Sequence, residues 1–234
     1  MNDSSSNDED ATQLSREDGE GLHLISRRLF HRAPTIDEYI INDNQSSLST
    51  GVIFTNECLR TSGKHPYPWQ VQVGVNIIEN TSIHQLLVRP TGGGKSMVYL
   101  ISGILLKGVT LCISPLLSLG ADQVNKLREL PRHGRDIFAY HLDEMTPSSI
   151  NYLASGLHQL HHSNTVFLFA SPQLLTEQQK GQRLLQSLFD LNLIRLIVFD
   201  EIHLVVGHGL SFRKPFLDVR MFVLSKLKYP FRLE

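Results

Sequence analysis

The residues of this chain that are best suited to chemistry form a glycine-rich run, Pro90 to Ser96, with the sequence Pro-Thr-Gly-Gly-Gly-Lys-Ser. An apolar run at residues 86–88 precedes it, and a helix-compatible run at residues 97–106 follows it. A strand, a glycine-rich turn and a helix in this order favour a phosphate-binding loop, because free backbone N–H groups and the positive end of the helix attract an anion. An ordinary surface loop is the alternative, and Lys-Ser directly after three glycines argues against it.

Each residue of this loop would have its own part in holding a nucleoside triphosphate. Lys95 can reach the outer phosphates, and Ser96 can place its hydroxyl on a magnesium ion. The backbone around the phosphates would come from Thr91, Gly92, Gly93 and Gly94. The general pattern G-x-x-x-x-G-K-[ST] has glycine at the position that Arg89 holds here, so the chain departs from the pattern at that place.

A second candidate site follows the apolar run at residues 196–199 and consists of Asp200, Glu201 and, two positions on, His203. Magnesium prefers oxygen ligands and keeps several waters, so Asp200 is suited to hold the ion beside Ser96. Glu201 would then orient or deprotonate the attacking water, which for a general base contributes about 10²–10⁴ in rate. For an isolated Asp-Glu pair a solvated strand end is the better interpretation, but the phosphate loop upstream favours a catalytic site.

From about Pro66 onward, short apolar runs alternate with longer amphipathic ones, which predicts parallel strands joined by crossover helices. We expect strands at residues 84–88, 109–113, 137–140, 165–169 and 196–199. We expect helices at residues 95–106, 117–130, 148–161, 173–189 and 217–228. The predicted fold is α/β, a three-layer αβα sandwich with a mostly parallel sheet. The polar motifs follow the carboxyl ends of its strands, where ligands bind in such sheets.

Charge is distributed unevenly along the chain. Residues 1–59 carry 4 Lys or Arg against 11 Asp or Glu, whereas residues 60–234 carry 18 against 12. The composition of residues 1–50 indicates a largely disordered, acidic leader, with a short helix expected within residues 22–51, before a domain at residues 60–234. The mildly basic domain is compatible with phosphate-rich partners, although charge alone gives nucleic acid little support.

The two cysteines, Cys58 and Cys112, are far apart in the sequence. We therefore expect neither a disulfide framework nor a structural zinc site. The first residues are acidic and polar, which does not fit a secretory signal, and no apolar run is long enough to cross a bilayer. These features predict an intracellular protein without a membrane partner.

Together the motifs resemble those of superfamily-two helicases with an Asp-Glu-x-His (DEAH) box, and most of all the RecQ group. The resemblance covers roughly residues 67–216 and includes the phosphate loop, residues 200–203 and the stretch Ser-Pro-Leu-Leu-Ser-Leu-Gly-Ala-Asp-Gln-Val at residues 114–124. It implies the first, ATP-binding RecA-like lobe of an ATP-dependent DNA helicase of the 3'-5' type, a hydrolase that uses ATP and Mg²⁺ and acts in the nucleus. By this resemblance the catalytic residues are Lys95, Asp200, Glu201 and His203.

The resemblance also implies contacts to the base and to DNA, single-stranded or partly duplex. Gln70 resembles the glutamine that recognises adenine in such enzymes, with Gln72 as the competitor and a surface glutamine as the alternative. DNA contacts are implied for Ser114, Ser118, Gln123, Ser171, Phe212 and Arg213. The two serines that precede a proline, Ser114 and Ser171, can equally act only as helix starts.

In the family His203 would link hydrolysis to strand movement, although a lone histidine is more often structural. The loop after it is aromatic-rich in RecQ proteins. Phe212 and Arg213 fit that pattern, whereas three positions within residues 208–211 do not. These differences weaken the expected coupling between DNA binding and ATP hydrolysis.

After residue 216 we find no room for the third helicase motif or for a second lobe with its arginine finger. We therefore expect a fragment or truncated product that cannot unwind DNA alone, its second lobe being supplied in cis or in a longer product. The alternative is a non-catalytic, nucleotide-dependent DNA-binding or interaction module, in which Arg89 and the altered loop at residues 208–211 mark decay of the motor. A phosphotransferase is disfavoured, because the Asp-Glu-x-His box suits activation of water. The oligomeric state does not follow from the sequence.

Overall fold

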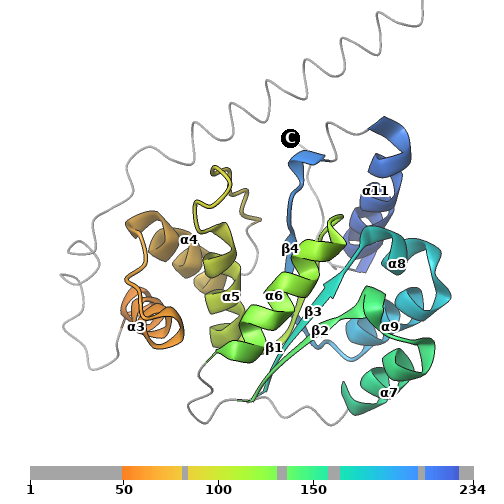
Figure 1. Cartoon of the computed structure of the whole chain (residues 1–234), viewed down its shortest axis with the longest axis horizontal. Coiled ribbons are helices and arrows are strands. Elements are labelled where there is room, and N and C mark those ends of the chain that lie inside the picture. The colour runs from red at the N-terminus through yellow and green to blue at the C-terminus, as the bar shows by residue number, and fades with distance from the viewer. Residues whose placement is uncertain (1–48, 81–83, 131–135, 158–163, 205–208, 227–234) are drawn as a thin grey trace, which may run out of the picture. The chain divides into compact units, whose positions relative to one another are not determined.

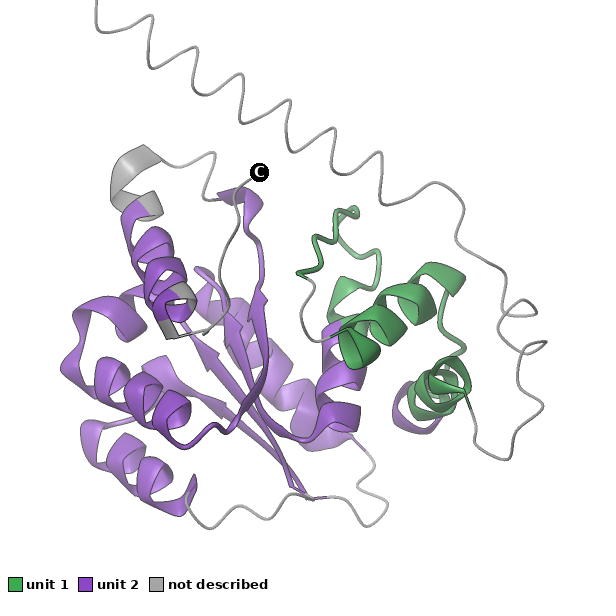
Figure 2. Cartoon of the chain, turned by 180° about the vertical axis from the view of Figure 1, so that it is seen from behind, with its two compact units in different colours: residues 1–59, 63–98 green, residues 60–62, 99–234 purple. Residues whose placement is uncertain are grey.

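The computed structural model describes residues 49–80, 84–130, 136–157, 164–204 and 209–226. The chain divides into two compact units, drawn in green and purple in Figure 2. The first unit comprises residues 1–59 and 63–98, and the second comprises residues 60–62 and 99–234. The acidic leader up to residue 48 lies outside the described residues, and so does most of the stretch in which the sequence predicts a short helix.

Two helices dominate the described part of the first unit, α3 (Thr50–Ser62) and α4 (Pro68–Glu79) (Figure 1). Gly63, with φ 68°, ends α3 in the left-handed conformation that favours glycine. Phe54 of α3 is fully buried, and its ring lies so close to Gly74 of α4 that a side chain at that position would overlap it. The absence of a side chain at Gly74 is therefore what lets the two helices pack at this short range.

The strand predicted at residues 84–88 is wrong in this structure, since residues 84–90 adopt no regular secondary structure. A strand is formed only where backbone groups pair with a neighbouring strand, and none of the ladders of the sheet includes these residues. Val88 is 57% exposed, so the apolar run is only partly covered. The irregular segment leads directly into the glycine-rich loop.

The second unit contains a four-stranded parallel sheet (Figure 1). Its strands are β1 (Gly108–Ile113), β2 (Ile137–His141), β3 (Thr165–Ala170) and β4 (Ile194–Phe199). Their order is β2-β3-β1-β4, and each pair of neighbours is parallel. These strands confirm the last four of the five predicted ranges. Because the strands are parallel, the loops after them, including the one that carries Asp200, leave from the same edge of the sheet.

Helices cover both faces of this sheet, which confirms the α/β architecture predicted from the sequence. The helices are α5 (Lys95–Leu106), α6 (Leu117–Glu129), α7 (Pro147–Leu157), α8 (Pro172–Glu177), α9 (Gln179–Asp190) and α11 (Gly209–Lys226), with a short 3-10 helix, η1 (Leu142–Glu144). On one face α6 packs on β2 and β3, and Gly103 of α5 lies against Thr110 and Phe167. On the other face alternate residues of β1 and β3 form the main core with α7, α8, α9 and α11.

The predicted helices differ from the structure in two places. Residues 173–189 form two helices instead of one, because Gln178 between α8 and α9 has an extended backbone (φ -106°, ψ 125°). No glycine or proline marks this break in the sequence. Helix α11 begins at Gly209, eight residues earlier than predicted. The last predicted residues of two helices, 158–161 and 227–228, lie outside the described residues.

Candidate functional site

The glycine-rich loop turns sharply between residues 91 and 94 and opens α5 at Lys95, as the sequence predicts. Gly94 has φ 84°, a left-handed conformation that side chains with a Cβ rarely adopt. A Cβ at Gly94 would also lie 2.7 Å from Nε2 of Gln70. The loop is closed at its start by a hydrogen bond of 3.1 Å from the Gly93 N–H to the carbonyl oxygen of Pro90. Glycine at position 94 is therefore required both by the backbone and by a close neighbour.

The ammonium group of Lys95 is folded back onto the beginning of its own loop. Its Nζ donates hydrogen bonds to the carbonyl oxygens of Arg89, at 3.0 Å, and Pro90, at 3.2 Å. A lysine ammonium has three N–H donors, so these two contacts leave one for a phosphate oxygen. The loop thus holds its cation in place before any anion binds.

Gln70 connects the first turn of α4 to this loop. Its Oε1 accepts a hydrogen bond of 2.7 Å from the Tyr67 N–H, and its Nε2 donates one of 2.9 Å to the carbonyl oxygen of Gly94. The side chain is only 4% exposed. Gln72, the competitor in the sequence, lies two positions on and therefore projects from a different side of the helix. Gln70 is thus bonded directly to the backbone of the glycine-rich loop.

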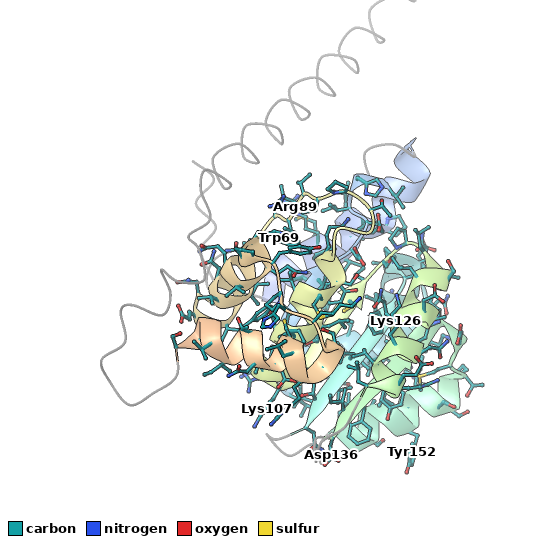
Figure 3. All side chains as sticks on the ribbon, turned by 60° about the vertical axis from the view of Figure 1, so that its left-hand side comes forward. Trp69, Arg89, Lys107, Lys126, Asp136 and Tyr152 are labelled. Atoms are coloured by element: carbon teal, nitrogen blue, oxygen red, sulfur yellow. The ribbon has the colours of Figure 1, made fainter. Side chains whose placement is uncertain are left out.

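Three side chains beside the loop form a stack that sequence reasoning missed. The rings of Tyr67 and Trp69 are stacked, with centroids 6.4 Å apart and an interplanar angle of 10°. The Cζ atom of Arg89 lies 4.8 Å from the centroid of the Trp69 ring, as Figure 3 shows for these two labelled residues. The available signal was the departure of Arg89 from the general loop pattern. The sequence did not indicate that Arg89 contacts Trp69.

In the second unit, the chain passes from β4 into a tight turn at Asp200 and Glu201. The Asp200 N–H donates to the carbonyl oxygen of Ile113 at 2.9 Å, and Oδ1 of Asp200 accepts from the Glu201 N–H at 2.9 Å. Glu201 has φ 54°, and for a residue other than glycine this conformation costs about 1–3 kcal/mol and is concentrated at functional sites. Its Oε2 lies 3.2 Å from Nδ1 of His203, whose side chain is 70% exposed.

The environment of Asp200 also includes a buried thiol. Burial, and to a smaller extent the Asp200 carboxylate, raises the pKa of Cys112 well above its ordinary value. Burial alone raises the pKa of Cys58 to about 12. Both cysteines are free and buried. Neither thiol is therefore suited to act as a nucleophile, because the thiolate is the reactive form.

The donors expected to share a magnesium ion belong to different units. Ser96 and the other loop residues are part of the first unit, and Asp200 and Glu201 are part of the second. A hydroxyl and a carboxylate are oxygen donors of the kind that magnesium prefers, so the two residue types fit the ion. Their joint action on one metal stays a prediction.

The residues expected to contact DNA fall into three groups. Ser118 is exposed, whereas Ser114, Gln123 and Ser171 are at most 8% exposed. The Ser171 hydroxyl caps α8 by accepting the Leu174 N–H at 3.1 Å, which is the helix-start alternative. The side chains of Phe212 and Arg213, like residue 208, lie outside the part of the chain that the structure describes.

A buried polar network around Asp143 is a further feature that the sequence did not reveal. Oδ1 of Asp143 accepts from the Ser171 hydroxyl at 2.5 Å, and Oδ2 accepts from the Ser171 N–H at 2.8 Å. His141, 6% exposed, lies beside it, with Nδ1 at 3.0 Å from Oε1 of Glu144. A Cβ at Gly120 would lie 2.9 Å from the His141 ring. The hydrogen bonds link the ends of β2 and β3, and the His141 ring packs against the first turn of α6 at Gly120.

Comparison with known proteins gives concordant matches. A family model described as "DEAD/DEAH box helicase" matches residues 67–223. ATP-dependent DNA helicase hus2/rqh1 of Schizosaccharomyces pombe is 35% identical over 131 residues, which is 54% of this chain and 10% of that protein. RecQ-like DNA helicase BLM of Xenopus laevis is 34% identical over 130 residues, 54% of this chain and 9% of that protein. ATP-dependent DNA helicase RecQ of Bacillus subtilis is 27% identical over 147 residues, 63% of this chain and 23% of that protein.

The chain thus spans less than a quarter of the length of each of these relatives. Within the described residues, no helix is both long and apolar enough to span a membrane.

Proposed function

The chain belongs to the DEAD/DEAH box helicase family, and on that premise we propose that it is the ATP- and nucleic-acid-binding lobe of a RecQ-like, ATP-dependent DNA helicase. The observation that carries the proposal is the ordered loop in which Gln70 and Lys95 are both bonded to the loop backbone. Such a loop presents backbone N–H groups and one ammonium proton to a triphosphate. The relatives named above are DNA helicases, which supports the same substrate class.

The base would be recognised at the start of α4. Each end of the Gln70 amide has one hydrogen bond in this structure and keeps the capacity for a second, because the oxygen has two lone pairs and the nitrogen two hydrogens. Tyr67 is 63% exposed, and its ring offers an apolar face to a purine. The loop and α4 therefore supply phosphate and base contacts within one unit.

Hydrolysis would be assisted by the turn after β4. Glu201 accepts a proton from water as the water oxygen forms a bond to the γ-phosphorus and the bond to the ADP oxygen breaks. The contact with His203 at 3.2 Å orients the Glu201 carboxylate. Mg²⁺, held by Ser96 and Asp200, would neutralise charge on the phosphates. ADP and phosphate are the products.

DNA would cross the loops at the carboxyl ends of the strands. Ser118 is exposed and can donate directly to a phosphate oxygen, whereas Ser114, Gln123 and Ser171 would act by shaping the loops around it, since they are buried. Phe212 and Arg213 complete the proposed set. We include in the proposal a second lobe supplied by a longer product, 3'-5' movement and a nuclear location.

A non-catalytic, nucleotide-dependent DNA-binding module is the second candidate, and the departure at Arg89 is the observation that favours it. Such a module would bind ATP without turnover that DNA stimulates. Phosphate release measured with and without single-stranded DNA separates the two candidates.

The proposed ATP site is tested by titrating the chain into a fluorescent ATP analogue with and without Mg²⁺. Lys95→Ala should weaken binding at least tenfold, because the loop loses the ammonium that faces the outer phosphates. Lys126→Ala, which removes an exposed lysine from α6, is the matched control and should leave the affinity unchanged. Equal affinity of Lys95→Ala and the unchanged chain would remove the loop from the proposal.

A further inference from the structure

Arg89 is the residue of the loop region that the general phosphate-loop pattern does not explain. It stands where that pattern has glycine, and it is half-buried. Its guanidinium group lies over the Trp69 ring, with Cζ 4.8 Å from the ring centroid, and its carbonyl oxygen accepts a hydrogen bond from Nζ of Lys95 at 3.0 Å. Arg89 therefore contacts Trp69 of helix α4 through its side chain (Figure 3) and Nζ of Lys95 through its backbone.

We propose that Arg89 is a positioning residue of the nucleotide site: its contact with Trp69 fixes the carbonyl group that holds Lys95 ready for the triphosphate. This inference rests on the proposed function and deepens it. A positioning role also explains why arginine stands where the general pattern has glycine. Decay of the motor would not explain that choice of residue.

The backbone at Arg89 couples the position of its side chain to the direction of its carbonyl group. Pro90 follows it, and a proline restricts the residue before it to extended conformations. With the backbone limited in this way, fixing the Arg89 side chain on Trp69 also limits the direction of its carbonyl oxygen. That oxygen is one of the two that hold the Lys95 ammonium. Arg89 therefore links the Trp69 ring to the Lys95 ammonium, through its side chain on one side and its carbonyl oxygen on the other.

The same turn of α4 holds the far end of the loop. Gln70, next to Trp69, donates to the carbonyl oxygen of Gly94 at 2.9 Å. The loop between has left-handed glycines at positions 92 and 94, which leave a free chain many conformations. Fixing both ends to one helix reduces the freedom that is lost when a ligand binds, and such preorganisation strengthens binding. A glycine at position 89 would leave the first end without this tether.

The contact of Arg89 with Trp69 is a cation–π interaction, and the free energy of such interactions has a known range. An arginine over a tryptophan face, partly removed from water, is worth about fivefold in an equilibrium constant. We therefore expect Arg89→Met, which keeps the length of the side chain but removes the charge and the planar group, to weaken binding of a fluorescent ATP analogue about fivefold. Trp69→Leu should weaken it to a similar extent. Because the two residues act through one contact, the double variant should bind about as well as either single variant.

Trp69 is the sole tryptophan of the chain, so its fluorescence reports on this contact without any nucleotide. In Arg89→Met, acrylamide should quench Trp69 more strongly than in the unchanged chain, because the ring loses its cover. Arg89→Lys keeps the charge but not the planar group and should restore affinity only in part. Arg128→Met, which changes an exposed arginine of α6, is the control for both measurements and should alter neither. The thermal unfolding midpoint is followed in every variant to identify loss of fold.

The outcomes separate this inference from the proposed function. If the unchanged chain does not bind the ATP analogue, both are wrong. If it binds and Arg89→Met binds equally well, or if the losses of the two single variants multiply in the double variant, the positioning role of Arg89 is wrong and the ATP site stands. If quenching of Trp69 is the same with and without the Arg89 guanidinium, the contact does not exist in solution and the inference falls on that ground alone.

Discussion

The side-chain amide of Gln70 donates a hydrogen bond to the backbone carbonyl of Gly94 at 2.9 Å, across 24 positions of the chain. The bond ties the beginning of a helix to the last glycine of the phosphate loop. It also means that the residue expected to recognise adenine is already in contact with the loop that would hold the phosphates. A single buried side chain thus joins the predicted base site to the predicted phosphate loop.

Gly94→Ala should break this arrangement. A Cβ at this position meets Nε2 of Gln70 at 2.7 Å and requires a left-handed backbone at φ 84°, so either the loop or Gln70 must shift. We expect the affinity for a fluorescent ATP analogue to fall roughly tenfold, since left-handed backbone alone costs about 1–2 kcal/mol in such residues. Gly156→Ala is the control, because a Cβ there meets nothing within 4 Å and the backbone of α7 accepts alanine. A Gly94→Ala chain with undiminished affinity would show that the loop adapts freely.

The parts of the fold that depend on local pattern could be predicted from the sequence. Short apolar runs mark the strands β1 to β4, and Lys95 begins its helix where the glycines end. The predictions of secondary structure failed where the structure depends on contacts with residues that are distant in the sequence. Residues 84–88 have the composition of a strand, but strand formation depends on a pairing partner elsewhere in the chain. Gln178 interrupts a continuous amphipathic pattern with an extended backbone (φ -106°, ψ 125°), which no residue type at that point indicates.

The candidate site likewise contains residues that the sequence identified and contacts that only the fold reveals. Lys95, Ser96, Asp200 and Glu201 could be named as candidates because their types and order in the chain are suited to the chemistry. The contact of Arg89 with Trp69 and that of Asp143 with Ser171 join residues 20 or more positions apart, so only the fold reveals them. For Ser171 the sequence left two roles open, and the structure shows the helix cap while the DNA role stays a prediction.

Asp143→Ala should destabilise the second unit. The carboxylate accepts both the N–H and the hydroxyl of Ser171, which is 6% exposed, so its removal leaves buried donors without an acceptor. We expect the free energy of unfolding to fall by about 2 kcal/mol in a denaturant titration. Asp143→Asn keeps an acceptor oxygen and should recover part of the loss. Asp122→Ala removes an exposed carboxylate from α6 and should have little effect. Similar stability of Asp143→Ala and Asp122→Ala would show that the network contributes nothing.

The buried thiols make stability depend on pH at the alkaline end. Burial raises the pKa of Cys58 from 9.0 to about 12, so between these values the unfolded chain releases the thiol proton while the folded chain keeps it. Unfolding is then favoured as the pH rises, and stability should fall from about pH 9 upward. Comparing urea titrations at pH 8 and pH 10 measures the slope. Cys58→Ala should reduce the slope without abolishing it, because burial also raises the pKa of Cys112. An unchanged slope in that variant would assign the effect to other groups.

Glu201→Gln tests whether the turn after β4 is catalytic. The substitution keeps the shape of the side chain and the left-handed backbone at φ 54°, but an amide cannot accept the proton of the attacking water. In a phosphate-release assay with Mg²⁺ and single-stranded DNA, ATP hydrolysis should fall by about 10²–10⁴ while binding of the ATP analogue is retained. Glu129→Gln, an exposed carboxylate at the end of α6, controls for the loss of one charge. Because Glu201 also contacts His203 at 3.2 Å, His203→Ala should lower turnover less than Glu201→Gln if the histidine only orients the carboxylate. Equal hydrolysis by Glu201→Gln and the unchanged chain would remove Glu201 from the mechanism and leave the strained turn without a catalytic role.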